Sequence, residues 1–216
     1  MSFASYTSFG TSLAGWLLDT NTATITDVGV TQVADLITVG ESRIFREARS
    51  RDMETSFGST IASGVIALPT GYLDLKSAYV NTSPTVRLER RSEEWLNINY
   101  PSTITGIPQF IGRQGSNFIF GPYPDSNYTI NGIYYQTPTA ISGAAVNTLF
   151  TNNPDLYLFA CLAEAEIIIG RDARVQLWEA KYNKILSLVN GTDQRENASG
   201  SSLQTRTRTN QSFRAA

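Results

Sequence analysis

The stretch that most constrains the fold is residues 154–190, which has the pattern of two consecutive helices. Pro154 suits the first position of a helix, because its missing N–H would have no partner there. Residues 156–169 are apolar on almost every side, and a helix of this kind is buried on most of its faces. After Gly170, apolar residues recur every three or four positions, which predicts a second helix that ends at Asn190-Gly191. The rest of the chain must supply partners for these two helices.

Two more helices are expected near the start of the chain. In residues 5–18, Phe9 and Leu13 fall on one face, as in a short amphipathic helix. A longer helix is expected at residues 31–50, which carry an apolar stripe at the same spacing. Gly40 lies within that stripe and costs about 1 kcal/mol of helix stability relative to alanine. We therefore expect another helix to cross close to Gly40.

The second half of the helix expected at residues 31–50 is dense in charge, and it includes Glu41, Arg43, Arg46 and Arg49. One interpretation is a solvated face with ion pairs at spacings of three and four. The other is a surface that contacts a second subunit or a partner protein. Both interpretations stay open, and the four residues are the candidate interface.

Between the helices, residues 64–140 change to the pattern of strands. Residues 72–80 and 86–90 are expected to be strands, the second because apolar and polar side chains alternate. Gly115-Ser116 predicts a tight hairpin turn between two short strands. Residues 128–135 predict a last strand, although Asn131-Gly132 within it is equally typical of a second turn. This region is expected to form a small antiparallel β module.

The expected fold class is α+β: a helical bundle of about four helices with an inserted small antiparallel β module and a flexible C-terminal arm. The helical domain would comprise residues 1–63 and 141–191, the β module residues 64–140, and the arm residues 192–216. The arm is rich in Ser, Thr, Asn, Gln and Arg, and has too few apolar residues to offset the entropy of ordering. It is either a frayed tail or a docking arm that grips a partner through Arg206, Arg208, Phe213 and Arg214.

Composition excludes several classes of function. The 216 residues carry a net charge of −2, which does not favour wrapping of DNA phosphates. There is no histidine, so the catalytic triads and metal sites that need it are absent, and no phosphate-binding glycine motif occurs. No stretch approaches the roughly 20 apolar residues of a membrane span. We expect no catalytic residue, cofactor, metal or membrane partner.

The order of several short motifs resembles the head-to-tail adaptor family of short-tailed bacteriophages, the tail tubular protein A-like group. Each motif is common by itself, but their order and spacing match over residues 13–190. The matching motifs are Glu41-Ser42-Arg43-Ile44-Phe45-Arg46, Leu68-Pro69-x-x-Tyr72-Leu73, Gly106-x-Pro108-x-Phe110, Gly121-Pro122-Tyr123-Pro124 and Asp172-x-Arg174-x-x-x-Trp178-x-x-x-Tyr182.

This resemblance implies a structural protein of the virion that is made in the host cytoplasm. It would form a twelve-fold ring at the head-tail junction, joining the portal protein to the tail nozzle and lining the channel through which genomic DNA passes. The arm would dock on the portal through Arg206, Arg208, Phe213 and Arg214.

Two other classes of function stay open from the residues. A virion-associated cell-wall hydrolase would use acids such as Glu93 and Glu164, and a carbohydrate- or receptor-binding tail module would use the tyrosine-rich strands near Tyr134 and Tyr135.

Overall fold

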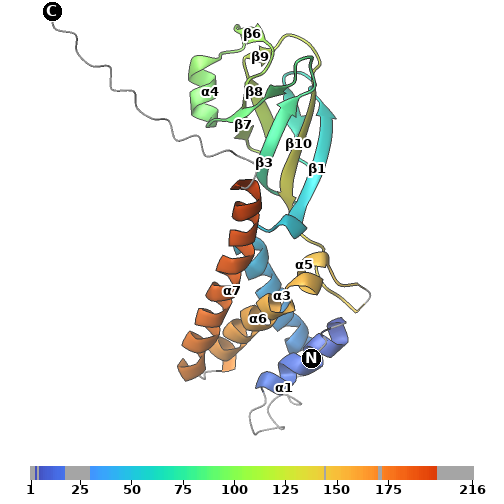
Figure 1. The fold of residues 1–216 in the computed structure, drawn as a ribbon, viewed down its shortest axis with the longest axis vertical. Helices are drawn as coiled ribbons and strands as arrows, with labels where there is room; N and C mark the ends of the chain where they lie inside the picture. The colour runs from blue at the N-terminus through green and yellow to red at the C-terminus, as the bar shows by residue number, and fades with distance from the viewer. Residues whose placement is uncertain (1–2, 4, 18–29, 144, 170–171, 199–216) are drawn as a thin grey trace, which may run out of the picture.

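The computed structural model describes residues 3, 5–17, 30–143, 145–169 and 172–198. The molecule is elongated, with the longer helices at one end and the strands at the other (Figure 1). Helices from both ends of the sequence make up the helical part, and the chain crosses to the strands after α3 and returns after β10.

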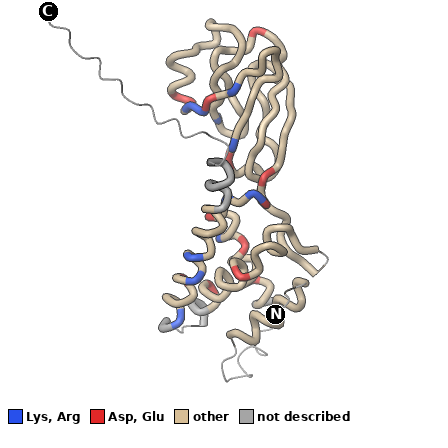
Figure 2. The backbone as a smooth tube through the Cα atoms, viewed as in Figure 1, with Lys and Arg blue, Asp and Glu red and all other residues tan. Residues whose placement is uncertain are grey.

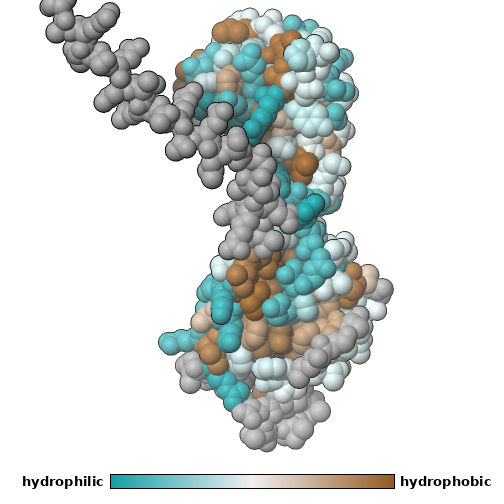
Figure 3. Space-filling model, in the orientation of Figure 1, coloured by the Kyte–Doolittle hydropathy of each residue, from teal (hydrophilic) through white to brown (hydrophobic). Residues whose placement is uncertain are grey.

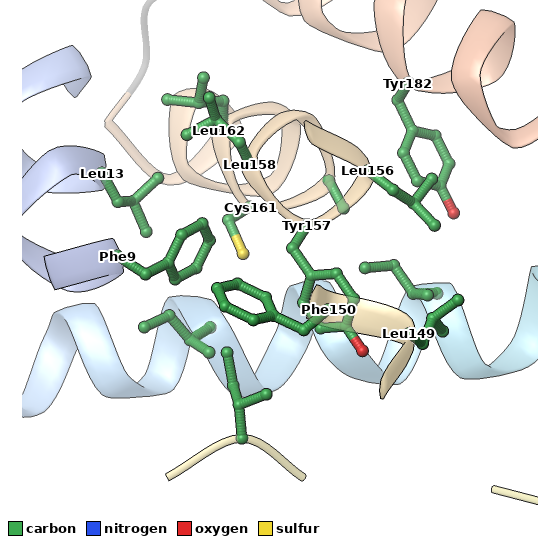
Figure 4. Packing of buried hydrophobic residues seen from close by; sticks show 14 of the residues in the cluster. Phe9, Leu13, Leu149, Phe150, Leu156, Tyr157, Leu158, Cys161, Leu162 and Tyr182 are labelled. Atoms are coloured by element: carbon green, nitrogen blue, oxygen red, sulfur yellow. The ribbon is translucent and has the colours of Figure 1, made fainter. Parts of the chain in front are cut away.

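The helical part contains one helix whose surroundings account for its composition. The helix α6 (Pro154–Ile169) packs against α1 (Tyr6–Leu17), α3 (Val30–Glu47), α5 (Thr148–Asn152) and α7 (Asp172–Ala198). This arrangement explains why α6 is apolar on nearly every side. Figure 4 shows Phe9 of α1 and Phe150 of α5 pointing toward α6, where they lie beside its own Tyr157.

The strand part contains two four-stranded sheets and one two-stranded sheet. The first has the order β1 (Glu54–Thr60), β10 (Thr129–Gln136), β3 (Tyr72–Val80), β4 (Val86–Arg87). The second has the order β2 (Val65–Ala67), β8 (Asn117–Gly121), β7 (Phe110–Gln114), β5 (Glu89–Arg90). The small sheet pairs β6 (Thr105–Gly106) with β9 (Tyr123–Pro124), and the helix α4 (Glu93–Asn99) lies beside β7 and β8.

The two larger sheets share a hydrophobic core of their own. Phe118 of the second sheet stacks on Phe57 of the first at 5.9 Å between ring centroids and meets Tyr72 edge-on at 5.4 Å. The strand expected at residues 86–90 is divided at the buried Leu88, so that β4 pairs with β3 in one sheet and β5 pairs with β7 in the other. One short segment therefore supplies an edge strand to each of the two sheets.

The predicted helical bundle with a small antiparallel insert is wrong. The structure is mixed α+β, and its buried apolar residues divide into two separate cores, one among helices and one between sheets. The pairs β5·β7 and β6·β9 are parallel, so the strand part is not simply antiparallel. Periodicity finds individual helices and strands, but it does not reveal that the strands bury a core independent of the helices.

Individual elements also differ from expectation. The first sheet begins at Glu54, before residue 64, and the short helix α5 was not predicted. The chain stays extended through Asn131-Gly132, which decides against a turn there. The last helix does not end at Asn190-Gly191 but continues to Ala198. The expected break at Gly170 and the docking-arm residues Arg206, Arg208, Phe213 and Arg214 lie outside the described residues, and the division of the chain into domains stays a prediction.

Candidate functional site

The charged end of α3 lies where three long helices meet. Of the four residues expected at an interface, Glu41 is buried, Arg43 and Arg49 are half-buried, and Arg46 is exposed. Glu41, Arg43 and Arg49 therefore make much of their contact with other residues of the same chain. Their role in an interface with a second subunit or partner stays a prediction.

Arg43 joins three helices through its guanidinium group. Its Nη1 donates to Glu179 Oε2 on α7 at 2.9 Å and to Glu164 Oε1 on α6 at 3.2 Å, and its Nη2 donates to Glu179 Oε1. The guanidinium carbon also lies 4.3 Å from the ring centroid of Tyr182, within cation–π range. The hydrogen bond from Arg43 is the main reason that the pKa of Glu179 is lowered, and the same bond raises the pKa of Arg43.

A second set of contacts holds the end of α3 against α7. The hydroxyl of Tyr182 donates to Glu47 Oε2 at 2.8 Å, and burial together with this contact raises the pKa of Tyr182. The main-chain N–H of Arg49 donates to Asn190 Oδ1 at 2.8 Å. Asn190 was expected to lie at the end of a helix. Instead, its side-chain oxygen binds the segment that follows α3. These contacts fix the direction in which the chain departs for the strands.

Glu41 holds the segment that returns from the strands. Its side chain is 4% exposed, and its Oε1 accepts a hydrogen bond from the main-chain N–H of Ile141 at 3.0 Å. Burial raises the pKa of Glu41 to about 7, although the Ile141 N–H partly opposes the shift. The neighbouring Gly40 packs against Cys161 on α6, where an added Cβ would lie 2.6 Å from Sγ. The close helix crossing expected at Gly40 is confirmed.

Several residues of this site were missed at the level of sequence. Glu164 stands with Glu166 in a helix that is apolar on nearly every side, and that position was the one signal of a partly buried cationic partner. Nothing in the local sequence connects Glu179, Tyr182 or Asn190 to α3, because these contacts span more than 130 positions along the chain.

Two exposed helix faces flank this internal cluster. On α3 the exposed residues Asp35, Val39, Ser42 and Arg46 follow helical spacing, and Val39 is 42% exposed. On α7 the exposed face carries Leu177, Lys181, Lys184 and Leu188, and its leucines are 52% and 58% exposed. Figure 2 shows basic residues along the outer side of α7, and Figure 3 shows hydrophobic surface beside them.

The residues considered for the alternative functions are occupied by other contacts. Glu164 pairs with Arg43, and Glu93 accepts a hydrogen bond from Gln114 at 2.7 Å. Tyr134 and Tyr135 are buried, so they do not present an aromatic face for a sugar. Among the described residues, no group of three or more His, Cys, Asp or Glu is placed to hold a metal ion. None of the helices in the described ranges is both long and apolar enough to span a bilayer.

Comparison with known proteins gives the family. No curated protein matches the chain. The model of the SU10 adaptor protein family matches residues 4–208, nearly the whole sequence. This match confirms the predicted resemblance to phage head-to-tail adaptors. Adaptors of this kind are structural proteins of the phage virion that act at the head-tail junction. The chain therefore belongs to the SU10 adaptor protein family.

Proposed function

We propose that this adaptor assembles into a ring of twelve copies that joins the portal protein to the tail nozzle and surrounds the channel for genomic DNA. The observation that carries the proposal is the family match over residues 4–208. The protein would be made in the host cytoplasm and built into the virion there. Its near-neutral charge of −2 suits a channel wall along which DNA slides without strong binding.

The two exposed helix faces support a ring. A closed ring of identical subunits needs two different surfaces on each copy, because every contact is head-to-tail. The α3 face, defined by Asp35, Val39, Ser42 and Arg46, and the α7 face, defined by Leu177, Lys181, Lys184 and Leu188, differ in charge and both expose apolar side chains. We assign the α3 face to one side of the subunit contact and the α7 face to the other.

The four predicted interface residues then divide their roles. Arg46 lies on the exposed α3 face and would contact the neighbouring copy directly. Glu41, Arg43 and Arg49 would act from inside, because their contacts set where α3 lies relative to α6, α7 and the strands.

The arm is assigned to the portal. Beyond Ala198 the sequence carries three arginines and no acidic residue, and Arg206, Arg208, Phe213 and Arg214 combine charge with one aromatic anchor. Repetition around a ring would multiply a weak contact of this kind into a strong one.

Co-sedimentation with portal rings from the same virus tests the proposal. Full-length protein should sediment with the portal at a ratio near one adaptor per portal subunit. A variant that ends at Ala198 should keep the same circular dichroism and unfolding temperature but lose attachment, because α7 stays complete. A matched control replaces Lys181 and Lys184 by Gln and should keep its arm contact while weakening ring closure. Folded full-length protein that stays in the supernatant would overturn the adaptor assignment to the portal.

A further inference from the structure

Within the part of the chain that the structure describes, β1 is an edge strand of the first sheet with one side unpaired. Among the described residues it pairs on one side only, with β10, over seven residues without a register shift. The other edges of the two large sheets are much shorter: β2 has three residues, and β4 and β5 have two each. Long unprotected edges are rare in proteins, because they pair with any strand that reaches them.

The register shows which main-chain groups β1 offers. The N–H of Ile61 donates to the C=O of Tyr128 at 2.9 Å, and this pair continues the β1·β10 register. Hydrogen-bonded and non-bonded positions alternate in an antiparallel pair. Counting back from Ile61, the main-chain groups of Ser56, Gly58 and Thr60 are therefore directed away from β10. These three residues are also exposed.

The usual protections of an edge are missing from β1. Residues 55–60 contain no charge and no proline, and the strand has no bulge. By contrast, the opposite side of the same sheet is covered by Arg90, whose Nη1 donates to the C=O of Leu75 at 3.2 Å and whose Nη2 lies 2.8 Å from Asp74. A charged side chain therefore covers the β3 side of the first sheet, whereas β1 has no such cover among the described residues.

We propose that residues 203–210 of a neighbouring copy pair with the open edge of β1 in the assembled ring. No described strand of the neighbour suits this edge: β2, β4 and β5 are too short, and pairing β1 with β1 would require a two-fold axis that a head-to-tail ring lacks. In residues 203–210, Leu203 and the threonines at 205, 207 and 209 alternate with polar residues, which is the pattern of a strand. The link from Ala198 to Leu203 spans up to about 17 Å when extended, and the paired residues 203–210 cover about 26 Å, slightly more than the about 23 Å of β1.

The placement of the two elements suits a contact between neighbours, and the proposal rests on the ring and arm assigned under the proposed function. In the view of Figure 1 the end of α7 is drawn below the strand part on the side of β3, whereas β1 is the edge of the first sheet on the other side of β10. An arm that leaves one copy at the β3 side meets the β1 side of the next. Strand pairing uses main-chain groups, so the side chains of Arg206 and Arg208 stay available for the portal.

Cysteine cross-linking in the full-length protein tests the pairing. The native Cys161 is buried, so introduced thiols react without competition from it. Two single variants, Ser56→Cys and Thr207→Cys, are mixed, assembled on portal rings and oxidised. The expected product is a covalent dimer that needs both variants. Ser102→Cys, exposed in the segment between α4 and β6, replaces Ser56→Cys as the control and should give no dimer with Thr207→Cys.

A scan of the arm distinguishes a strand from a loose contact. With Ser56→Cys fixed, cysteines placed one at a time at positions 204–209 should cross-link at alternate positions, because successive side chains of a strand point to opposite faces. A further variant carries Ser56→Pro, and its cross-linking to the arm is measured at a cysteine introduced by Thr60→Cys. This variant should lose cross-linking, because proline removes an N–H that would bond the arm. Its unfolding temperature should be unchanged, because that N–H is not bonded to β10. Rings that form on the portal without cross-links, or with cross-links at every arm position, would overturn the strand pairing and leave the adaptor function intact. Failure of ring assembly itself would count against the proposed function.

Discussion

Arg43 on α3 and Glu179 on α7 form a forked pair, in which Nη1 donates to Oε2 of the carboxylate and Nη2 donates to Oε1. The same Nη1 also reaches Glu164 on α6, so one cation neutralises acids from two other helices. Such forked contacts are the strong form of an ion pair, because they combine charge with fixed geometry. The cluster holds three helices together at the point where the chain leaves for the strands.

Replacing Arg43 by alanine should lower the free energy of unfolding by about 2–4 kcal/mol. Removing one partner of a fully buried pair costs about 3–5 kcal/mol, and the loss is smaller here because the Glu179 side chain is 38% exposed. Urea unfolding followed by circular dichroism measures the change. The exposed Arg46→Ala on the same helix is the control and should stay within about 0.5 kcal/mol of wild type. An equal effect of both variants would mean that Arg43 acts only through general surface charge.

Glu41 should make the protein less stable as pH rises from about 4.5 to about 7. Its pKa in the folded chain is raised to about 7 from 4.5, so between these values the folded state binds a proton that the unfolded state has lost. The difference corresponds to about 3 kcal/mol once both states are ionised. Unfolding measured at several pH values should show this slope in wild type and its loss in Glu41→Gln, whose amide oxygen still accepts the Ile141 N–H.

The control for this pH dependence is Glu94→Gln, because Glu94 is exposed. Its profile should match that of wild type. If Glu41→Gln keeps the full slope between pH 5 and pH 8, another group is responsible and Glu41 is ionised in the folded protein.

The parts of the fold that could be predicted are those that local sequence patterns specify. The apolar stripes of α1 and α3, the proline at the start of α6 and the two-residue turn before β8 each specify one element through neighbouring residues. Gly115 in that turn has φ 58°, which glycine adopts readily. The edge strand β1 was missed because Phe57 is its one large apolar residue, and an edge strand needs only a weak alternating pattern.

The parts that could not be predicted depend on contacts between distant residues. Asn190-Gly191 is typical of a helix end, but the Asn190 side chain binds Arg49 and the hydrogen bonds of α7 continue to Ala198. In the candidate site, the charges on α3 were visible, but their partners Glu164, Glu179 and Tyr182 lie on helices more than a hundred residues away. The packing of α3 against α6 and α7 decides whether a charged side chain on α3 faces solvent or another helix.

Gly40→Ala should destabilise the protein although alanine favours helices. The added Cβ would lie 2.6 Å from Cys161 Sγ and 3.2 Å from its main-chain N and Cα, so α3 and α6 would have to move apart. Overpacking of this kind costs about 1–3 kcal/mol. The matched control is Gly15→Ala in α1, where nothing lies within 4 Å of the new Cβ, and this change should stabilise by about 0.5–1 kcal/mol. Thermal unfolding of both variants gives the two signs, and a stabilised Gly40→Ala would contradict the close crossing.

Trp178→Ala should cost about 3 kcal/mol, near the low end of the about 3–5 kcal/mol measured for large truncations in cores. The indole is half-buried, stacks on Phe159 at 5.8 Å and meets Trp16 edge-on at 6.0 Å. Its Nε1 is buried, and no described residue accepts a hydrogen bond from it. Trp178→Phe should therefore lose much less stability than Trp178→Ala, because it keeps an aromatic ring and gives up no hydrogen bond within the described chain. Denaturant unfolding of the two variants measures the contrast, and equal losses would show that the indole N–H, rather than ring packing, carries the contribution of Trp178.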